Sequence, residues 1–172
     1  MKTPKTVDAR AKILGREELR ARLAEHRQRG ESVVLANGCF DVLHVGHARY
    51  LAGAKCEGDV LVVAVNSDSS EAQLKGAGRP ILPEKARAEL VAAFAAVDYV
   101  VIFGEPNVES LLTELRPAVH AKGTDYTAAT VPERELAAKL GIRVAIVGDP
   151  KDHSTKDLLR RVHNTGAGRR DG

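Results

Sequence analysis

The sequence predicts an α/β fold in which a five-stranded parallel sheet lies between two layers of helices. Short apolar runs rich in Val, Ile and Ala alternate along the chain with longer segments of helical periodicity. Strands that are joined through helices run parallel, and the connecting helices cover both faces of the sheet. The length of 172 residues fits one domain. We expect that domain to span residues 1–172, with its core at about 31–163.

Five apolar runs are expected to form the strands. Continuous apolar segments of this kind are typical of parallel strands that are buried on both faces. The expected strands are residues 33–36, 60–65, 99–103, 118–121 and 144–147. Their alternation with helices predicts a Rossmann-like three-layer sandwich.

Six segments beside these runs have the apolar spacing of helices. They are residues 16–29, 47–55, 84–97, 108–115, 132–140 and 155–162. Pro83 and Pro132 stand at expected helix starts, Asn107 and Ser154 at cap positions, and Gly141 after an expected end. Residues 1–9 and 164–172 lie outside the alternation and are expected to be mobile ends.

Composition and charge argue against several classes of protein. Aromatic residues make up 3% of the chain and Trp is absent, so stacking platforms for single-stranded nucleic acid are scarce. The net charge of +3 arises mainly from the two ends of the chain, so no basic surface for duplex DNA is indicated. No stretch approaches the roughly 20 apolar residues of a membrane span, and no secretory signal is visible. Cys39 and Cys56 are too few for a disulfide scaffold, and we expect free thiols in a cytoplasmic protein.

The segment 37–47 follows the first expected strand and is the most informative part of the sequence. In Rossmann-like sheets ligands bind where the strand order reverses, so this loop and residues 122–126 after the fourth strand should meet. His44 and His47 flank Gly46, which places both rings near a helix N-terminus, where N–H groups and the helix dipole favour anions. Two histidines at this spacing also fit half of a metal site without an evident third ligand, or residues that only cap the helix.

The run His44-Val-Gly-His47 resembles the HxGH signature of a superfamily of nucleotidyltransferases, and Asn37-Gly-Cys-Phe-Asp41 extends the match. Within the superfamily, the chain is most similar to the adenylyltransferases that act on D-glycero-β-D-manno-heptose 1-phosphate in ADP-heptose synthesis. The likeness covers about residues 31–163. Its further blocks are Asn66-Ser-Asp68, Leu74-Lys-Gly76, Arg79-Pro80, the helix with Arg87, Val97-Asp-Tyr99, Lys122-Gly-Thr-Asp-Tyr126 and Ser154-Thr155. In many relatives this domain is fused to a sugar kinase.

The resemblance implies that a sugar phosphate oxygen attacks the α-phosphorus of ATP and that pyrophosphate is released. It implies His44, His47 and Lys55 as catalytic residues, and the substrate-binding residues Asn66, Asp68, Lys75, Arg79 and Arg87. The implied nucleotide-binding residues are Asn37, Gly38, Cys39, Phe40, Asp41, His44, Gly46, His47, Lys122, Gly123, Asp125, Ser154, Thr155 and Lys156. Mg²⁺ should accompany ATP, held mainly by phosphates and water rather than by a protein metal site. A homodimer is expected from the resemblance alone.

Several of these residues also have a simpler interpretation. Lys55 fits a surface charge, and Gly123 and Asp125 fit a turn. Residues 66–83 fit either a mobile loop that closes over a substrate or a solvated connection. Relatives often carry Ser-Thr-Thr preceded by Arg where this chain has Lys156 and His153. Two other functions stay open: cytidylyl transfer to glycerol 3-phosphate, and a nucleotide-sensing module without turnover.

Overall fold

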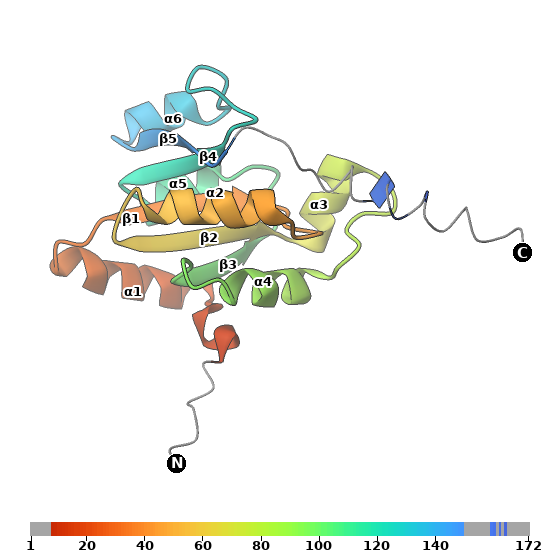
Figure 1. Ribbon diagram of the computed structural model, residues 1–172. Helices are drawn as coiled ribbons and strands as arrows, with labels where there is room; N and C mark the ends of the chain where they lie inside the picture. Colours follow the sequence, from red (N-terminus) through yellow and green to blue (C-terminus); the bar gives the residue numbers. More distant parts are fainter. Residues whose placement is uncertain (1–7, 150–158, 161, 163, 165–172) are drawn as a thin grey trace, which may run out of the picture.

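The computed structural model describes residues 8–149, 159, 160, 162 and 164. It is a three-layer α/β sandwich around one five-stranded parallel sheet (Figure 1). The strands are β1 (Val33–Gly38), β2 (Val60–Asn66), β3 (Tyr99–Phe103), β4 (Val119–Gly123) and β5 (Arg143–Val147), in the order β3-β2-β1-β4-β5. The expected fold class is confirmed, and each expected strand is present with ends that differ by at most two residues.

The helices follow the expected alternation with two additions. They are η1 (Ala9–Lys12), a 3₁₀ helix, and α1 (Arg16–Gln28), α2 (Val45–Lys55), α3 (Asp68–Lys75), α4 (Glu84–Ala92), α5 (Glu109–Leu115) and α6 (Arg134–Lys139). The two additions are η1 and α3. The 3₁₀ helix η1 begins at Ala9, the last residue of the segment 1–9 that was expected to be a mobile end. Residues 1–7, 165–172 and most of the expected helix 155–162 lie outside the described residues.

Two apolar clusters hold the layers together. Leu51 of α2 and Val91 of α4 belong to the cluster on one face of the sheet. Leu19 of α1, Leu112 of α5 and Ala137 of α6 belong to the cluster on the other face. In the view of Figure 1, α2 lies in front of the sheet and α5 behind it. Because both faces are covered, β2 is buried along its whole length, as its continuous apolar run predicts.

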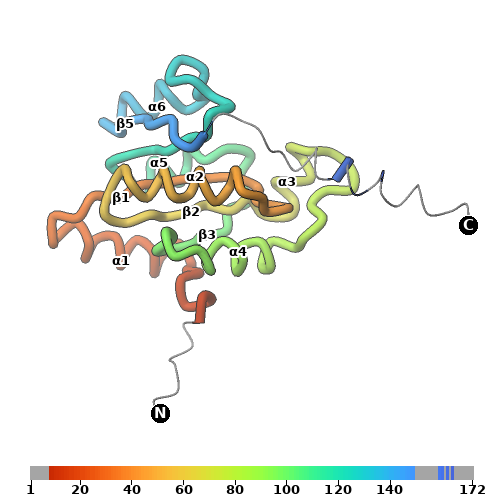
Figure 2. Tube along the Cα trace, viewed as in Figure 1, coloured from red at the N-terminus to blue at the C-terminus, as the bar shows by residue number. Residues whose placement is uncertain are grey.

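The strand order reverses between β1 and β4. From β1 the chain passes through α2 to β2 and β3 on one side, and then returns through α5 to β4 and β5 on the other side. The loops that follow β1 and β4 therefore open at the same edge of the sheet, at the switch point where ligands bind in such folds. Figure 2 shows α3 standing beyond this edge, directly after β2.

Candidate active site

A cavity of about 880 Å³ opens at the switch point. Segments that follow β1, β2, β4 and β5 form its walls, together with the first turns of α2 and the end of α3. The structure brings these expected site residues to it: Asn37, Gly38, Cys39, Phe40, Asp41, His44, Gly46, His47, Asn66, Lys75, Arg79, Lys122, Gly123 and Asp125. The expected meeting of loops 37–47 and 122–126 is thus confirmed.

His44 and His47 are built into the start of α2. His44 is the N-cap residue, and its Nδ1 accepts the backbone N–H of Gly46 at 3.1 Å. The backbone N–H of His44 is donated in turn to Nδ1 of His47 at 3.3 Å. The ring centroids lie 3.9 Å apart, and both residues border the cavity. The histidines therefore cap the helix and face the ligand space at once.

These hydrogen bonds determine where the two neutral rings carry their protons. In a neutral imidazole one nitrogen donates and the other accepts. Since Nδ1 accepts a backbone N–H in both His44 and His47, the proton of each neutral ring lies on Nε2. Burial, reinforced by His44, lowers the pKa of His47 to about 4, so this ring is neutral at neutral pH. Two N–H donors at a helix N-terminus suit the oxygens of a phosphate group.

The ring of Phe40 packs against the ring of His47. Its ring is 2% exposed and lies 5.3 Å from the His47 ring between centroids. Phe40 has a left-handed backbone with φ of 53°, which turns the ring back over the end of β1. A Cβ atom on Gly38 would lie 3.1 Å from the Phe40 ring, so the close approach of this ring favours glycine at position 38.

Tyr50 of α2 ties β1 to β4 beneath the cavity. Its hydroxyl accepts the backbone N–H of Asn37 at 3.3 Å and donates to the carbonyl of Ala121 at 2.9 Å. Burial raises the pKa of Tyr50, so the hydroxyl remains a donor. The sequence analysis missed Tyr50, because a tyrosine on the apolar face of a helix carries no signal of this role.

Lys122 lies at the end of β4 and is 6% exposed. Its Nζ is 3.5 Å from Oε2 of Glu133, 3.4 Å from Oδ1 of Asn37 and 4.8 Å from the centroid of the Tyr126 ring. Burial lowers the pKa of Lys122, and Glu133 opposes that shift. His120, to which the sequence analysis gave no role, places Nε2 3.2 Å from the same Oδ1 of Asn37.

Asp41 borders the cavity, but its carboxylate is used inside the protein. It accepts the backbone N–H groups of Ile81 at 2.9 Å and Leu82 at 2.8 Å, and it pairs with Arg79 at 2.7 Å. The Asp41 side chain is 1% exposed. The carboxylate of Asp41 therefore holds residues 79–82 against the loop after β1.

Arg87 and Asp68, which the resemblance implied as substrate-binding residues, do not line the cavity and pair with each other. The Arg87 side chain is 0% exposed and donates to the carbonyls of Leu82 at 2.9 Å and Cys39 at 2.6 Å. It also pairs with Asp68 at 2.8 Å and with Glu71 at 3.0 Å. A guanidinium has five N–H donors in a fixed fork, and here four groups of the chain itself surround it. Arg87 is thus a buried cross-link, and Asp68 is one of its partners.

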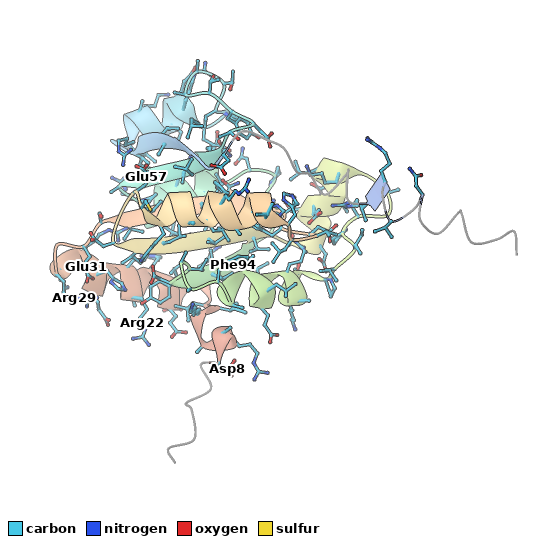
Figure 3. The ribbon with its side chains drawn as sticks, in the orientation of Figure 1. Asp8, Arg22, Arg29, Glu31, Glu57 and Phe94 are labelled. Carbon is cyan, nitrogen blue, oxygen red and sulfur yellow. The ribbon has the colours of Figure 1, made fainter. Side chains whose placement is uncertain are left out.

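Lys55, which the resemblance implied as a catalytic residue, lies at the far end of α2 and does not line the cavity. Its ammonium pairs with Asp98 at 2.6 Å and donates to the carbonyl of Asp59 at 2.6 Å. Glu57, two residues further on, is labelled in Figure 3 at the end of the sheet remote from α3. The surface interpretation of Lys55 is the one that the structure supports.

Residues 66–83 contain a helix rather than the expected loop. Ser67 caps α3 by accepting the N–H of Ser70 at 3.2 Å, and Asn66 donates to the Ser70 hydroxyl at 2.9 Å. Part of this stretch is therefore helical, although most residues of α3 are exposed to solvent. Lys75, the last residue of the helix, and Arg79 still border the cavity.

Cys39 contributes no reactive thiol. Burial is the main cause that raises its pKa to about 11, and Sγ lies 3.8 Å from Oδ1 of Asn66. A thiol that stays protonated is a poor nucleophile. The other expected nucleotide-binding residues, Ser154, Thr155 and Lys156, lie outside the described residues, and so does His153.

Within the part of the chain that the structure describes, no three His, Cys, Asp or Glu side chains are grouped so that they could hold a metal ion. The histidine pair therefore gains no further metal ligand from those residues. None of the described helices combines the length and the apolar character that a membrane crossing needs.

A parallel sheet with an HxGH pair at its switch point defines a nucleotidyltransferase domain. Residues 35–162 match the model of the cytidylyltransferase-like family, and the chain belongs to that family. The match covers both walls of the cavity, from the loop after β1 to the segment after β5.

Similar proteins include two that are described as "Bifunctional protein HldE". The one from Syntrophotalea carbinolica is 44% identical over 152 residues, which covers 88% of this chain and 31% of that protein. The one from Pseudomonas aeruginosa is 40% identical over 154 residues, which covers 90% of this chain and 32% of that protein. The chain thus spans about a third of the length of these relatives.

A solved structure with the same fold is described as the lipopolysaccharide core biosynthesis protein from Thermoplasma volcanium. It is 29% identical to this chain and superimposes with a TM-score of 0.61. The match covers 71% of this chain and 100% of that one.

Proposed function

We propose that the protein is an adenylyltransferase that transfers AMP from ATP to D-glycero-β-D-manno-heptose 1-phosphate, giving ADP-heptose and pyrophosphate for envelope sugar synthesis. The observation that carries the reaction class is the His44–His47 pair, whose Nε2–H groups lie at a helix N-terminus in the switch-point cavity. The choice of sugar is supported by the similarity to HldE proteins over 90% of the chain and by the motif blocks beyond the HxGH signature.

In the proposed reaction, an oxygen of the sugar phosphate attacks the α-phosphorus of ATP in line with the leaving group. The bond from this phosphorus to the bridging oxygen of pyrophosphate breaks, and negative charge spreads over the phosphate oxygens. The attacking oxygen is already ionised, so the step needs no general base. His44 and His47 keep their protons and stabilise the developing charge by donating hydrogen bonds.

Positioning of the two substrates does the remaining work. The nucleotide would contact the loop after β4, where Lys122, Gly123 and Asp125 border the cavity. The sugar phosphate would contact the wall beneath α3, where Lys75 and the 20% exposed side chain of Arg79 supply positive charge. The histidine pair lies in the loop after β1, between these two walls.

Mg²⁺ enters this reaction with ATP and is part of the substrate. A nucleotide-bound Mg²⁺ keeps several waters and binds mainly phosphate oxygens, so it needs few protein ligands. The phosphates that carry the ion would meet the cationic side chains of Lys75, Arg79 and Lys122 at the cavity.

The proposal is tested by measuring pyrophosphate release with two nucleotides and two acceptors. The protein is incubated with Mg²⁺ and either ATP or CTP, together with heptose 1-phosphate or glycerol 3-phosphate. We expect release with ATP and heptose 1-phosphate, and at most a weak signal with the other pairs. A preference for CTP with glycerol 3-phosphate would replace the substrates that we propose. Nucleotide binding without release in every pair would contradict both enzymatic functions and favour a nucleotide-sensing module.

A further inference from the structure

Asn37 is the second-last residue of β1, at the switch point, and it borders the cavity. Its Oδ1 is 3.2 Å from Nε2 of His120 and 3.4 Å from Nζ of Lys122. We infer that His120 is a positioning residue, which together with Lys122 fixes the amide of Asn37 so that its NH₂ group faces the bound phosphates. No motif of the sequence assigns this role, since His120 lies inside a strand.

The chemistry of Lys122 determines the orientation of the amide. The two ends of an asparagine amide have the same shape, so their neighbours decide which end is oxygen. An ammonium group has three donors and no acceptor, and Glu133 at 3.5 Å favours the charged form of Lys122. The end of Asn37 that faces Lys122 is therefore the oxygen, and the NH₂ group points the other way.

The contact with Asn37 also determines which ring nitrogen of His120 carries the hydrogen. An oxygen that already faces Lys122 can only accept, so Nε2 of His120 must carry the hydrogen. Burial, with a smaller contribution from Lys122, lowers the pKa of His120 to about 3, and the ring is neutral. Nδ1 is then an acceptor, and it is buried without a hydrogen-bond partner among the described residues.

This unpaired acceptor argues for a role of His120 beyond stability. A buried acceptor without a partner destabilises a protein relative to an apolar residue of similar size. His120 is 0% exposed in the central layer, between Leu35 of β1 and Val144 of β5 in the strand register. An apolar residue would fill this place well, so what the histidine adds is its hydrogen bond to Asn37.

The consequence for the ligand is that Asn37 acts as a donor. With Oδ1 held by two donors, the NH₂ group is left to serve an acceptor in the cavity that Asn37 borders. Phosphate oxygens accept hydrogen bonds, so a phosphate group of the ligand fits the NH₂ group of Asn37. The inference rests on the proposed function in one respect, namely that the ligand carries phosphate groups.

The tautomer of His120 can be measured without any substrate. A long-range ¹H–¹⁵N spectrum of the ¹⁵N-labelled full chain distinguishes a protonated ring nitrogen from an unprotonated one, and the His120→Gln variant assigns the signal. We expect Nε2 protonated and Nδ1 unprotonated at neutral pH. A ring protonated on Nδ1, or an imidazolium, would overturn the inference whatever the protein catalyses.

A double-mutant cycle tests whether His120 acts through Asn37. We expect His120→Leu to lower kcat/KM and the affinity for ATP with Mg²⁺ by about tenfold, the value of roughly one hydrogen bond. His120→Gln, whose side-chain nitrogen comes near the place of Nε2, should restore most of this loss. In an Asn37→Ala background, His120→Leu should have little further effect.

The control for packing is Val144→Ala, which removes buried atoms beside His120 on the neighbouring strand. It should lower the unfolding midpoint and leave kcat/KM within about twofold. Equal losses from His120→Leu in both backgrounds would overturn the inference, because the effect would then not pass through Asn37. If no sugar phosphate supports turnover, the proposed function fails, while the spectrum and the ATP affinities still decide the role of His120.

Discussion

At the scale of single residues, the rings of His44 and His47 each perform two tasks. Nδ1 of His44 and of His47 accepts a backbone N–H and so shapes the start of α2. Nε2–H of each ring is the donor that the proposed reaction uses. Because the two tasks use different atoms, a suitable substitution can separate them.

His44→Asn is that substitution. Asparagine is a good N-cap residue, and its side-chain oxygen can accept the N–H that Nδ1 accepts now. It lacks a donor at the place of Nε2, so we expect kcat to fall by at least about 100-fold while the thermal midpoint stays near that of the wild type. His44→Ala should lose the cap as well, with about 1 kcal/mol of stability. Pyrophosphate release and thermal unfolding measure the two effects, and near-normal turnover of His44→Asn would remove the Nε2 donor from the mechanism.

Residue-scale prediction from the sequence worked where chemistry is local. The HxGH run and its flanks indicated most of the loop that borders the cavity, because residues adjacent in the chain are adjacent in the site. The ion pairs of Arg87 and Lys55 could not be predicted in this way, because their partners come from distant segments. Asp98, which pairs with Lys55, is 43 residues away in the chain. Nothing in the local sequence shows that such a cation is already paired.

At the scale of elements, the position of α2 depends on its contact with the end of β5. A Cβ atom on Gly53 would lie 3.1 Å from the backbone nitrogen of Gly148 and 3.2 Å from Cβ of Val147. Gly148 has φ of +93° and passes close to Tyr50, so the backbone there has little room to move. The contact sets how closely the helix that carries the histidine pair approaches the sheet.

Gly53→Ala tests this contact by the sign of its effect. Helix propensity alone predicts that alanine stabilises the helix by about 1 kcal/mol. The steric contact predicts the opposite, a loss of about 1–3 kcal/mol, because backbone rather than a flexible side chain must yield. Urea unfolding gives the answer, and we expect kcat to fall as well, since α2 carries His44 and His47. An increase in stability would show that α2 can shift without cost.

A second element-scale prediction concerns the buried cross-link at Arg87. Its partners belong to the loop after β1, to α3 and to the connection before α4. Arg87→Met should lower the free energy of unfolding by about 3 kcal/mol, because the buried Glu71 loses its ion pair with Arg87 at 3.0 Å and keeps only the longer one with Arg79 at 3.6 Å. The expected change in the KM for the sugar phosphate is small relative to this loss. A large rise in KM with unchanged stability would restore Arg87 as a substrate contact.

The helix that the sequence analysis missed, α3, shows why apolar periodicity has limits. Its eight residues, Asp68–Lys75, are mostly polar, and the helix is held by a serine cap and by Glu71 facing Arg87. Contacts of this kind leave no apolar stripe to detect. The five strands were predictable for the opposite reason, since a strand buried on both faces must be apolar at nearly every position.

At the scale of the whole molecule, the half-buried His47 and the buried His120 make stability depend on pH. The pKa of His47 is lowered to about 4 and that of His120 to about 3, both from an ordinary value of 6.5. Below pH 6.5 the unfolded chain therefore binds protons that the folded protein does not. The contribution of the two neutral rings to the free energy of unfolding is fully present above that pH. It declines as the pH falls toward the pKa values that the two histidines have in the folded protein.

Urea unfolding between about pH 7 and pH 5 measures this linkage. Each histidine contributes a slope of at most about 1.4 kcal/mol per pH unit, with stability lower at lower pH. His120→Leu should make the curve less steep by up to one such contribution. An unchanged slope in the variant would mean that His120 titrates as it does in the unfolded chain.

At the scale of the whole molecule, the cytoplasmic location and the homodimer stay predictions from the sequence. The proposed reaction is instead tested most directly by the fate of a labelled oxygen. Heptose 1-phosphate with ¹⁸O in its phosphate group is incubated with ATP, Mg²⁺ and the protein, and the products are analysed by mass spectrometry. Attack by the sugar phosphate on the α-phosphorus predicts that all the label appears in ADP-heptose and none in pyrophosphate. Label in pyrophosphate, or no ADP-heptose at all, would contradict the account.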